Sequence, residues 1–335
     1  MKVLLIGASG YVGSALDVKL RESGISVLEA PCDRRSVQPR RSEIDTAHMT
    51  YLAGLMADAG VIVHCVGSAL ESAEYDARSI VEAAIRSGVK KIVYMSSMAV
   101  YGFANADLDE EAPVPPTGTH YSDAMAFAER ELARFAQWGE VVIFRTGSIV
   151  GAGGRPWVQR IGALLSERRI GDLGRMGDGW SNIVALDDVC QAVVLSVIRP
   201  ALAHRLNVFN LAAPDSPRWN TYFRDFALAI DAAPLRRVSP GRIRVEVFAK
   251  APLLSAYRQL CELFPILPAC KLDAITPALI KTFHLAGKLN VSRIDAALSV
   301  RWTPYAQTVQ HAAAWYLAEQ QRTVIDPDAV SCRMH

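Results

Sequence analysis

A glycine-rich segment near the start of the chain has the composition of a phosphate-binding turn. Glycines stand at positions 7, 10 and 13, between a short apolar run and a stretch with helical spacing. We expect Gly7 to permit a tight turn, Gly10 to let the backbone approach a pyrophosphate, and Gly13 to allow close packing. The N-terminus of the following helix would offer free N–H groups and a positive dipole end. The alternative is an ordinary glycine-rich turn. The dinucleotide site predicted here consists of Gly7, Ser9, Gly10, Tyr11, Val12 and Gly13.

A basic cluster follows the second predicted strand. Domains that bind NAD usually carry Asp or Glu at the end of this strand, for the ribose 2′-hydroxyl. Here the equivalent position is Pro31, and Arg34 and Arg35 follow it. Arginine suits a 2′-phosphate because its guanidinium forms paired, charge-assisted hydrogen bonds. We therefore expect NADP as cofactor, with Arg34 or Arg35 as the main contact, and NAD as second choice. The alternative is a solvated basic loop.

Short apolar runs and helical patterns alternate along the first half of the chain. Continuous apolar runs such as Val61–Val66 suit strands that are buried on both faces. This alternation predicts an α/β fold with a doubly wound parallel sheet and right-handed crossovers. The expected strands are Lys2–Ile6, Ile25–Ala30, Val61–Val66, Lys91–Met95 and Val141–Phe144, and the expected helices are Tyr11–Glu22, Tyr75–Arg86 and Tyr121–Trp138.

The second half has a different pattern, with fewer strands and more helices. We expect a dinucleotide-binding domain over 1–150 and a smaller, mostly helical substrate region over 151–335, some of whose segments return to the sheet. Asp187 and Asp188 are expected to cap the helix that follows them. The expected strands are Asn182–Ala185 and Leu206–Leu211, the expected helices are Trp157–Glu167, Asp187–Ile198 and Trp219–Asp231, and from Arg242 onward we expect helix broken at Pro252, Pro265, Pro268 and Pro277.

Composition excludes several classes of protein. The net charge of +2 argues against a broad nucleic-acid-binding surface. The six cysteines include no CxxC pair, so we expect no metal site. No segment is long and apolar enough for an integral membrane helix, and the first apolar run is too short for a signal peptide. We therefore expect a cytoplasmic location.

Several motifs occur together in the order found in one family. The chain resembles the extended short-chain dehydrogenase/reductases of the NAD-dependent epimerase/dehydratase type, from Met1 to about Tyr316. That resemblance implies a Rossmann fold. The motifs are Gly7–Gly13, Ile44–Asp45, Val61–Gly67, Gly88–Ser97, Val100–Gly102, the Tyr121 helix, Arg145–Gly151, Gly177–Gly179 and Val184–Asp188.

The resemblance implies roles for particular residues. Ser97 and Tyr121 fall where the family keeps its catalytic Ser or Thr and its catalytic tyrosine. Other positions are expected to contact the cofactor: Ile44 and Asp45 beside the adenine, and Cys65, Val66 and Gly67 along the nicotinamide ribose.

One position departs from the family pattern, which is Tyr-x-x-x-Lys. Met125 stands where the lysine is expected, one helical turn after Tyr121 and facing the cofactor ribose. An ammonium there would favour the tyrosinate, whereas methionine carries no charge. Either another cation replaces the lysine, or the chemistry needs no tyrosinate, or the site has lost activity.

The substrate is the least constrained part of the prediction. Sugar-nucleotide enzymes usually place an arginine near position 181, but this chain has Trp180, Ser181 and Asn182 there. The apolar segment Val245–Leu272 is interpreted as core or a homodimer face, or else as a lid over a hydrophobic substrate or a membrane-surface contact. A diphosphate-bearing substrate stays possible because of four arginines: Arg155, Arg168, Arg169 and Arg175.

Three hypotheses of function follow. The first is an NADP-dependent oxidoreductase that acts on a carbonyl or secondary alcohol of a small, possibly hydrophobic molecule. The second is a nucleotide-sugar epimerase or dehydratase with retained NAD. The third is a non-catalytic regulatory protein that binds a dinucleotide, which is motivated by Met125.

Overall fold

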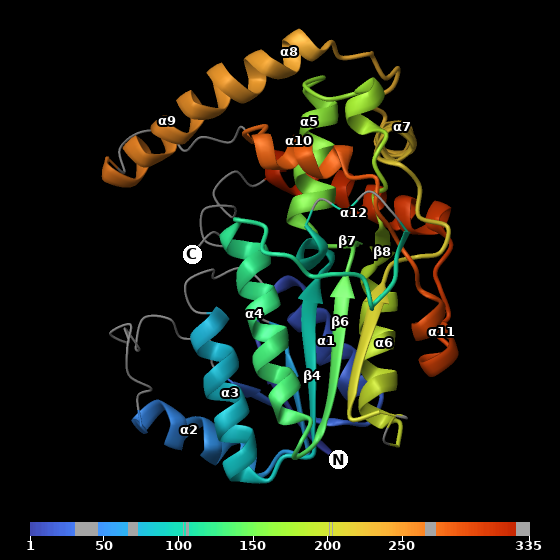
Figure 1. The fold of residues 1–335 in the computed structure, drawn as a ribbon. Helices are drawn as coiled ribbons and strands as arrows, with labels where there is room; N and C mark the ends of the chain where they lie inside the picture. The colour runs from blue at the N-terminus through green and yellow to red at the C-terminus, as the bar shows by residue number, and fades with distance from the viewer. Residues whose placement is uncertain are drawn as a thin grey trace. The chain divides into compact units, whose positions relative to one another are not determined.

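The structure is a computed structural model that describes residues 1–30, 46–65, 73–102, 104, 107–200, 202, 204–264 and 273–325. The chain forms two compact units (Figure 1). Unit 1 comprises Met1–Gly147, Val184–Pro214 and Leu289–Thr303, and unit 2 comprises Ser148–Ile183, Asp215–Lys288 and Pro304–His335.

Unit 1 is built on a six-stranded parallel sheet with the strand order β2-β1-β3-β4-β6-β9. Helices flank the sheet, so the predicted Rossmann-type α/β fold is confirmed. The strands are β1 (Lys2–Ile6), β2 (Ser26–Ala30), β3 (Val61–His64), β4 (Lys91–Ser97), β6 (Glu140–Thr146) and β9 (Leu206–Leu211). The helices are α1 (Tyr11–Glu22), α2 (Thr46–Ala57), α3 (Ala73–Ser87), α4 (His120–Phe135), α6 (Leu186–Ile198) and α11 (Ser292–Leu298), with a 3₁₀ turn, η1, over Met98–Tyr101.

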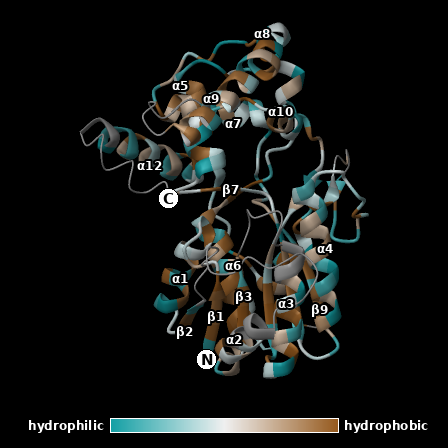
Figure 2. Cartoon of the chain, turned by 90° about the vertical axis from the view of Figure 1, so that its left-hand side faces the viewer, coloured by the Kyte–Doolittle hydropathy of each residue, from teal (hydrophilic) through white to brown (hydrophobic). Residues whose placement is uncertain are grey.

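The central strands are buried on both faces, which is why they read as continuous apolar runs. All four residues of β3 are buried, as are six of the seven in β4. Figure 2 shows β1 and β3 coloured as hydrophobic segments in the middle of the sheet. Because the sheet is parallel, the carboxyl ends of β1, β3 and β4 meet at one edge, which is where ligands bind in folds of this type.

The carboxyl end of the edge strand β9 is covered by polar groups of the same unit. The Glu110 carboxylate accepts a hydrogen bond from the Asn210 backbone N–H at 2.8 Å. The Asn210 side chain donates to the backbone carbonyls of Leu108 and Asn290, at 2.8 and 3.2 Å. These bonds occupy the outer side of β9 at its carboxyl end.

The expected cap of α6 is wrong. The N-cap of α6 is Ala185, and it makes no side-chain hydrogen bond. Asp188 is buried and instead accepts hydrogen bonds from Thr303, at 2.9 Å from the backbone N–H and 2.7 Å from the hydroxyl. Its carboxylate therefore fixes the chain at Thr303.

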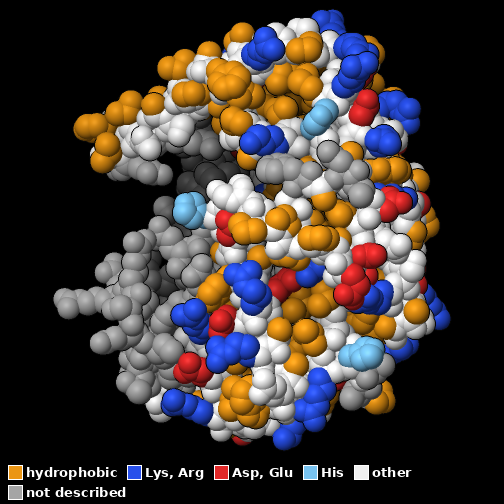
Figure 3. All heavy atoms as spheres, viewed as in Figure 1, with side chains coloured by type: hydrophobic (Ala, Val, Ile, Leu, Met, Phe, Trp, Pro, Cys, Tyr) orange, Lys and Arg blue, Asp and Glu red, His pale blue; other side chains and the backbone are white. Residues whose placement is uncertain are grey.

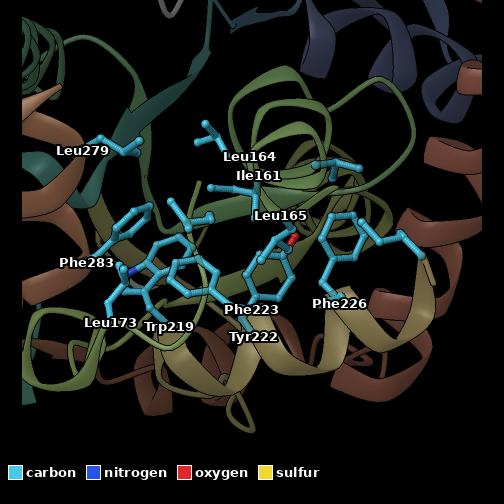
Figure 4. Close-up of a cluster of buried hydrophobic side chains, with 14 of the residues drawn as sticks. Ile161, Leu164, Leu165, Leu173, Trp219, Tyr222, Phe223, Phe226, Leu279 and Phe283 are labelled. Atoms are coloured by element: carbon cyan, nitrogen blue, oxygen red, sulfur yellow. The ribbon is translucent and has the colours of Figure 1, made fainter. Parts of the chain in front are cut away.

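Unit 2 is mostly helical and has an aromatic core. Trp219 on α7 is fully buried, and its ring centroid lies 4.9 Å from that of Phe283 and 5.8 Å from that of Phe223 (Figure 4). Leu164 and Phe226 pack in the same cluster. The helical segments are η2 (Arg155–Gln159), α5 (Arg160–Ser166), η3 (Gly174–Gly177), α7 (Trp219–Ala229), α8 (Pro240–Val245), η4 (Glu246–Lys250), α9 (Ala251–Leu263), α10 (Pro277–His284) and α12 (Tyr305–Ile325). The remaining short strands of the chain are β5 (Asp107–Leu108), β7 (Ser148–Val150), β8 (Ile183–Ala185) and β10 (Lys288–Leu289).

The break expected at Pro252 is also wrong. Helix continues from α8 through the π-helical η4 into α9, and Pro252 lies in the first turn of α9. Proline is tolerated in a first helical turn, and the π-turn before it changes the hydrogen-bond spacing where the proline N–H is missing. At Pro277, in contrast, a new helix begins, because Pro277 is the first residue of α10 and the described residues directly before it are not helical. Pro265 and Pro268 are outside the described residues.

Candidate functional site

The glycine turn connects β1 to α1 and has the geometry of a phosphate cradle. Gly7 has a φ of +93°, a conformation that favours glycine, and its carbonyl accepts from the Gly10 N–H at 3.0 Å. A Cβ at Gly13 would stand 2.0 Å from the Gly7 carbonyl oxygen, and one at Gly10 would stand 3.2 Å from it. Gly13 is therefore the strictest of the three positions, and it packs against the turn itself.

The N-terminus of α1 suits an anionic group. Its N-cap, Gly10, supplies no capping side chain, and the first turn contains no acidic residue. The helix N–H groups therefore have no side-chain acceptor at the cap. Within the turn, Ser9 and Gly10 are exposed, whereas Tyr11 and Val12 are partly buried. The turn fits the pyrophosphate of a dinucleotide, with Gly7, Ser9, Gly10, Tyr11, Val12 and Gly13 as the residues that would hold it.

Cys65 follows β3 directly and lies next to the glycine turn. Its backbone N–H donates to the Ile6 carbonyl at 2.9 Å. Burial raises the pKa of the Cys65 thiol, so the side chain is uncharged and lines the site rather than acting as a nucleophile. Six further residues expected to contact the cofactor lie outside the described residues: Arg34, Arg35, Ile44, Asp45, Val66 and Gly67.

The structure brings Ser97 and Tyr121 together. Ser97 ends β4 and caps η1 by accepting from the Ala99 N–H at 3.2 Å. Tyr121 lies in the first turn of α4, and its phenol is near enough to the Ser97 side chain for Ser97 to lower the pKa of the phenol. The two side chains therefore form a pair at the carboxyl edge of the sheet, on the β4 and α4 ribbons of Figure 1.

The Tyr121 phenol is held in its neutral form. Burial raises its pKa, and the nearby Ser97 side chain only partly opposes this effect. Within the part of the chain that the structure describes, no Lys or Arg side chain influences this pKa. The cation that would compensate for Met125 is thus not found among these residues.

Met125 is occupied by an interaction inside the unit. Its side chain is buried, and its Sδ accepts a hydrogen bond from the Tyr94 hydroxyl at 3.3 Å. The Tyr94 ring in turn stacks on the His64 ring, with centroids 5.4 Å apart and planes 11° from parallel. We expected Met125 to face the cofactor ribose; in the structure its thioether contacts Tyr94 of β4, and the contact with the ribose stays a prediction. Nothing in the sequence pattern identified Tyr94 or His64, because both lie in uniformly apolar strands.

His64 is a buried imidazole with an incomplete set of hydrogen bonds. It is 4% exposed, and its Nε2 has no hydrogen-bond partner among the described residues. Burial lowers its pKa to about 4, because the charged form loses its hydration.

This shift predicts a pH-dependent stability. In the unfolded protein the His64 imidazole binds a proton near pH 6.5, whereas in the folded protein it does so only near pH 4. The free energy of unfolding therefore falls as the pH is lowered between these values. The expected loss from His64 approaches about 3 kcal/mol at pH 4. Urea unfolding across this range measures it. His64→Phe keeps the ring stack and should flatten the dependence, while replacement of the exposed His204 by Phe should leave it unchanged. An equal slope in His64→Phe would contradict the assignment.

A buried ionic network connects the elements that carry Ser97 and Tyr121. Arg145 on β6 and Glu129 on α4 are both buried, and their closest atoms, Nη2 and Oε2, are 2.8 Å apart. The neighbour of Ser97, Ser96, donates to Glu129 at 2.5 Å. Arg145 also donates at 2.9 Å to the Tyr101 hydroxyl, whose pKa burial raises to about 12. The network thus ties α4, β4, η1 and β6 together, and sequence reasoning missed it.

The arginines considered for a diphosphate have different environments within unit 2. Arg169 is buried and bound to Glu246, with an N–O distance of 2.7 Å, so it has a structural role. Arg155, Arg168 and Arg175 are exposed.

Comparison with known proteins agrees with this geometry. A family model described as "NAD dependent epimerase/dehydratase family" matches residues 3–212. Protein YeeZ of Escherichia coli (strain K12) is 25% identical over 255 residues, which cover 70% of this chain and 86% of YeeZ. The UDP-glucose 4-epimerase of Neisseria gonorrhoeae is 27% identical over 184 residues, which cover 45% of this chain and 54% of that enzyme.

Among solved structures, the chain is similar to MoeE5 in complex with UDP-glucose and NAD. The TM-score is 0.65 at 18% identity, and the match covers 97% of this chain and 100% of MoeE5. This similarity supports the fold, and the cofactor in that neighbour is NAD, so NADP as first choice gains no support. The family model includes the glycine turn, the Ser97–Tyr121 pair and five of the six sheet strands completely. The chain therefore belongs to the NAD-dependent epimerase/dehydratase family.

Proposed function

We propose that the protein is a nucleotide-sugar epimerase or dehydratase that retains NAD. The observation that carries the proposal is the Ser97–Tyr121 pair at the same sheet edge as the glycine turn. Membership of the family and the similarity to UDP-glucose 4-epimerase support it. The comparisons give no support to the NADP-dependent carbonyl reductase that we expected first.

In this proposal, different residues of unit 1 bind the cofactor, orient the substrate and transfer the proton. The turn Gly7–Gly13 binds the pyrophosphate through backbone N–H groups. NAD, when bound, supplies the acceptor and donor of hydride. Ser97 donates a hydrogen bond to the reacting sugar oxygen and orients it. Tyr121 takes the proton of that hydroxyl as the carbon is oxidised, and returns it when the carbonyl is reduced.

The raised pKa of Tyr121 has a direct consequence for this chemistry. Oxidation needs the phenolate, which is scarce at neutral pH when the pKa lies above the ordinary value near 10. We therefore propose a slow enzyme, or one in which the bound substrate lowers the pKa of Tyr121. The second candidate function, a non-catalytic NAD-binding protein, is favoured by the engagement of Met125 with Tyr94.

Two measurements on the purified protein test the proposal. Denaturation and mass spectrometry of the released nucleotide should find NAD. Incubation with UDP-hexoses and no added cofactor, followed by NMR, should show a sugar with inverted configuration or a dehydrated keto sugar. Consumption of added NADPH with a simple carbonyl compound would instead favour a reductase. Retained NAD without turnover of any UDP-hexose between neutral and alkaline pH would favour the binding protein.

A further inference from the structure

Unit 2 carries a long helical segment that exposes large apolar side chains. It comprises α8, η4 and α9, from Pro240 to Leu263, and Phe264 follows it. Figure 3 shows hydrophobic side chains gathered along this segment, at the upper left of the view. The exposed side chains and their exposed fractions are Val245 53%, Phe248 74%, Leu253 70%, Leu260 46%, Leu263 72% and Phe264 57%.

The two halves of the segment differ in how they are anchored. Ile243 and Val247 are buried in the aromatic core of unit 2, and they hold α8 and η4 in place. After Ala251, every side chain described up to Phe264 is at least partly exposed. An isolated helix the length of α9 is marginally stable in water, so a surface that covered its apolar side chains would stabilise it.

The segment is also basic. From Pro240 to Phe264 it contains four basic residues and two acidic ones. Glu246, one of the two acidic residues, is buried and shared by Arg169 and Lys250, each at 2.7 Å. The basic residues are Arg242, Arg244, Lys250 and Arg258.

This combination fits one occupant. An amphipathic helix with Phe and Leu on one side and basic residues beside them lies in the interface of a membrane, where anionic headgroups attract the cations. A second copy of the chain fits less well, because a symmetric contact would set the same basic segments against each other. Among the described residues, no helix is long and apolar enough to cross a membrane, so the contact would be superficial.

We propose that the exposed side of α8–α9 binds the surface of an anionic phospholipid membrane. Phe248, Leu253 and Leu263 enter the acyl boundary, and Arg244 contacts the headgroups. The binding is independent of the sugar chemistry proposed for unit 1.

Flotation of the full-length protein with vesicles tests the proposal. The protein should float with vesicles of phosphatidylcholine mixed with phosphatidylserine, and less with phosphatidylcholine alone. The triple variant Phe248→Ser, Leu253→Ser, Leu263→Ser should bind at least about tenfold more weakly. Leu228→Ser is the matched control, because Leu228 is 62% exposed on α7 of the same unit.

A charge variant separates the electrostatic contribution. Arg244→Glu should weaken binding to the anionic vesicles, and added salt should reduce that difference. Arg301→Glu, at an exposed position of unit 1, should bind as the unmodified protein does.

Two results would overturn the proposal. The first is a failure of the unmodified protein to float with anionic vesicles. The second is a dimer in light scattering that the triple variant converts to a monomer, which would assign the surface to a second copy. Circular dichroism and thermal melts establish that each variant is folded. Retained sugar turnover in a variant that no longer floats would support the independence of the two functions.

Discussion

Tyr121→Phe is expected to lower kcat for the UDP-hexose by about a hundredfold to ten-thousandfold. The change removes only the phenolic oxygen, which is the atom that the proposed mechanism uses to take and return the proton. The NAD content should stay unchanged, because the glycine turn is untouched. The measurement is kcat together with the nucleotide released on denaturation. A loss of less than about tenfold would mean that Tyr121 does not carry the proton.

The pH profile of the unmodified protein distinguishes this role from a structural one. Because burial raises the pKa of Tyr121, the phenolate fraction increases about tenfold for each pH unit through the neutral and mildly alkaline range. The value of kcat should therefore climb from about pH 7 to 9, with no plateau due to Tyr121 between about pH 6 and 8. Ser97→Ala should lower kcat but keep this climb, whereas Tyr121→Phe should abolish it.

Glu129→Ala is expected to cost about 3–5 kcal/mol of the free energy of unfolding. It would leave Arg145, which is 6% exposed, as a buried charge without its carboxylate. It would also remove the acceptor of the Ser96 hydroxyl, next to Ser97. Urea denaturation measures the loss, and kcat should fall as well because α4 and β4 carry the reacting pair.

A matched surface change serves as control. Lys19 and Glu22 form an exposed ion pair on α1 at 3.5 Å, and Glu22→Ala should cost less than about 1 kcal/mol. Glu129→Gln keeps an acceptor in place and should cost less than Glu129→Ala. If Glu129→Ala and Glu22→Ala were equally stable, the buried network would not hold the sheet and α4 together.

The sequence was most informative where a single physical rule decides the structure. The predicted boundaries of β1 and α1 agree with the structure residue for residue, because the glycine turn ends one element and starts the next. The predicted strand Lys91–Met95 was two residues too short. In the structure β4 continues through Ser97, which pairs with Thr146 of β6, and the Ser96 hydroxyl donates to the buried Glu129 carboxylate.

Tertiary contacts decided the remainder. The spacing of Tyr121 and Met125 placed them one helical turn apart, but the partner of Met125 is Tyr94, far away in sequence and on another element. The helix continues past Pro252 because the π-turn η4 precedes this proline, and no residue pattern in the sequence predicted that turn. Glu129 lies in the predicted helix Tyr121–Trp138, and Arg145 directly follows the predicted strand Val141–Phe144, but only the fold brings the two into contact.

The polar closure of β9 also bears on the solubility of the folded protein. An edge strand with free backbone groups is a template on which a strand of another molecule can pair and start an aggregate. At Asn210 the N–H already has the Glu110 carboxylate as acceptor, and the Asn210 side chain binds the carbonyls of Leu108 and Asn290. An incoming strand would have to break these hydrogen bonds and leave a carboxylate buried without its donor. The same contacts that finish the sheet thus protect this end of β9 from intermolecular pairing.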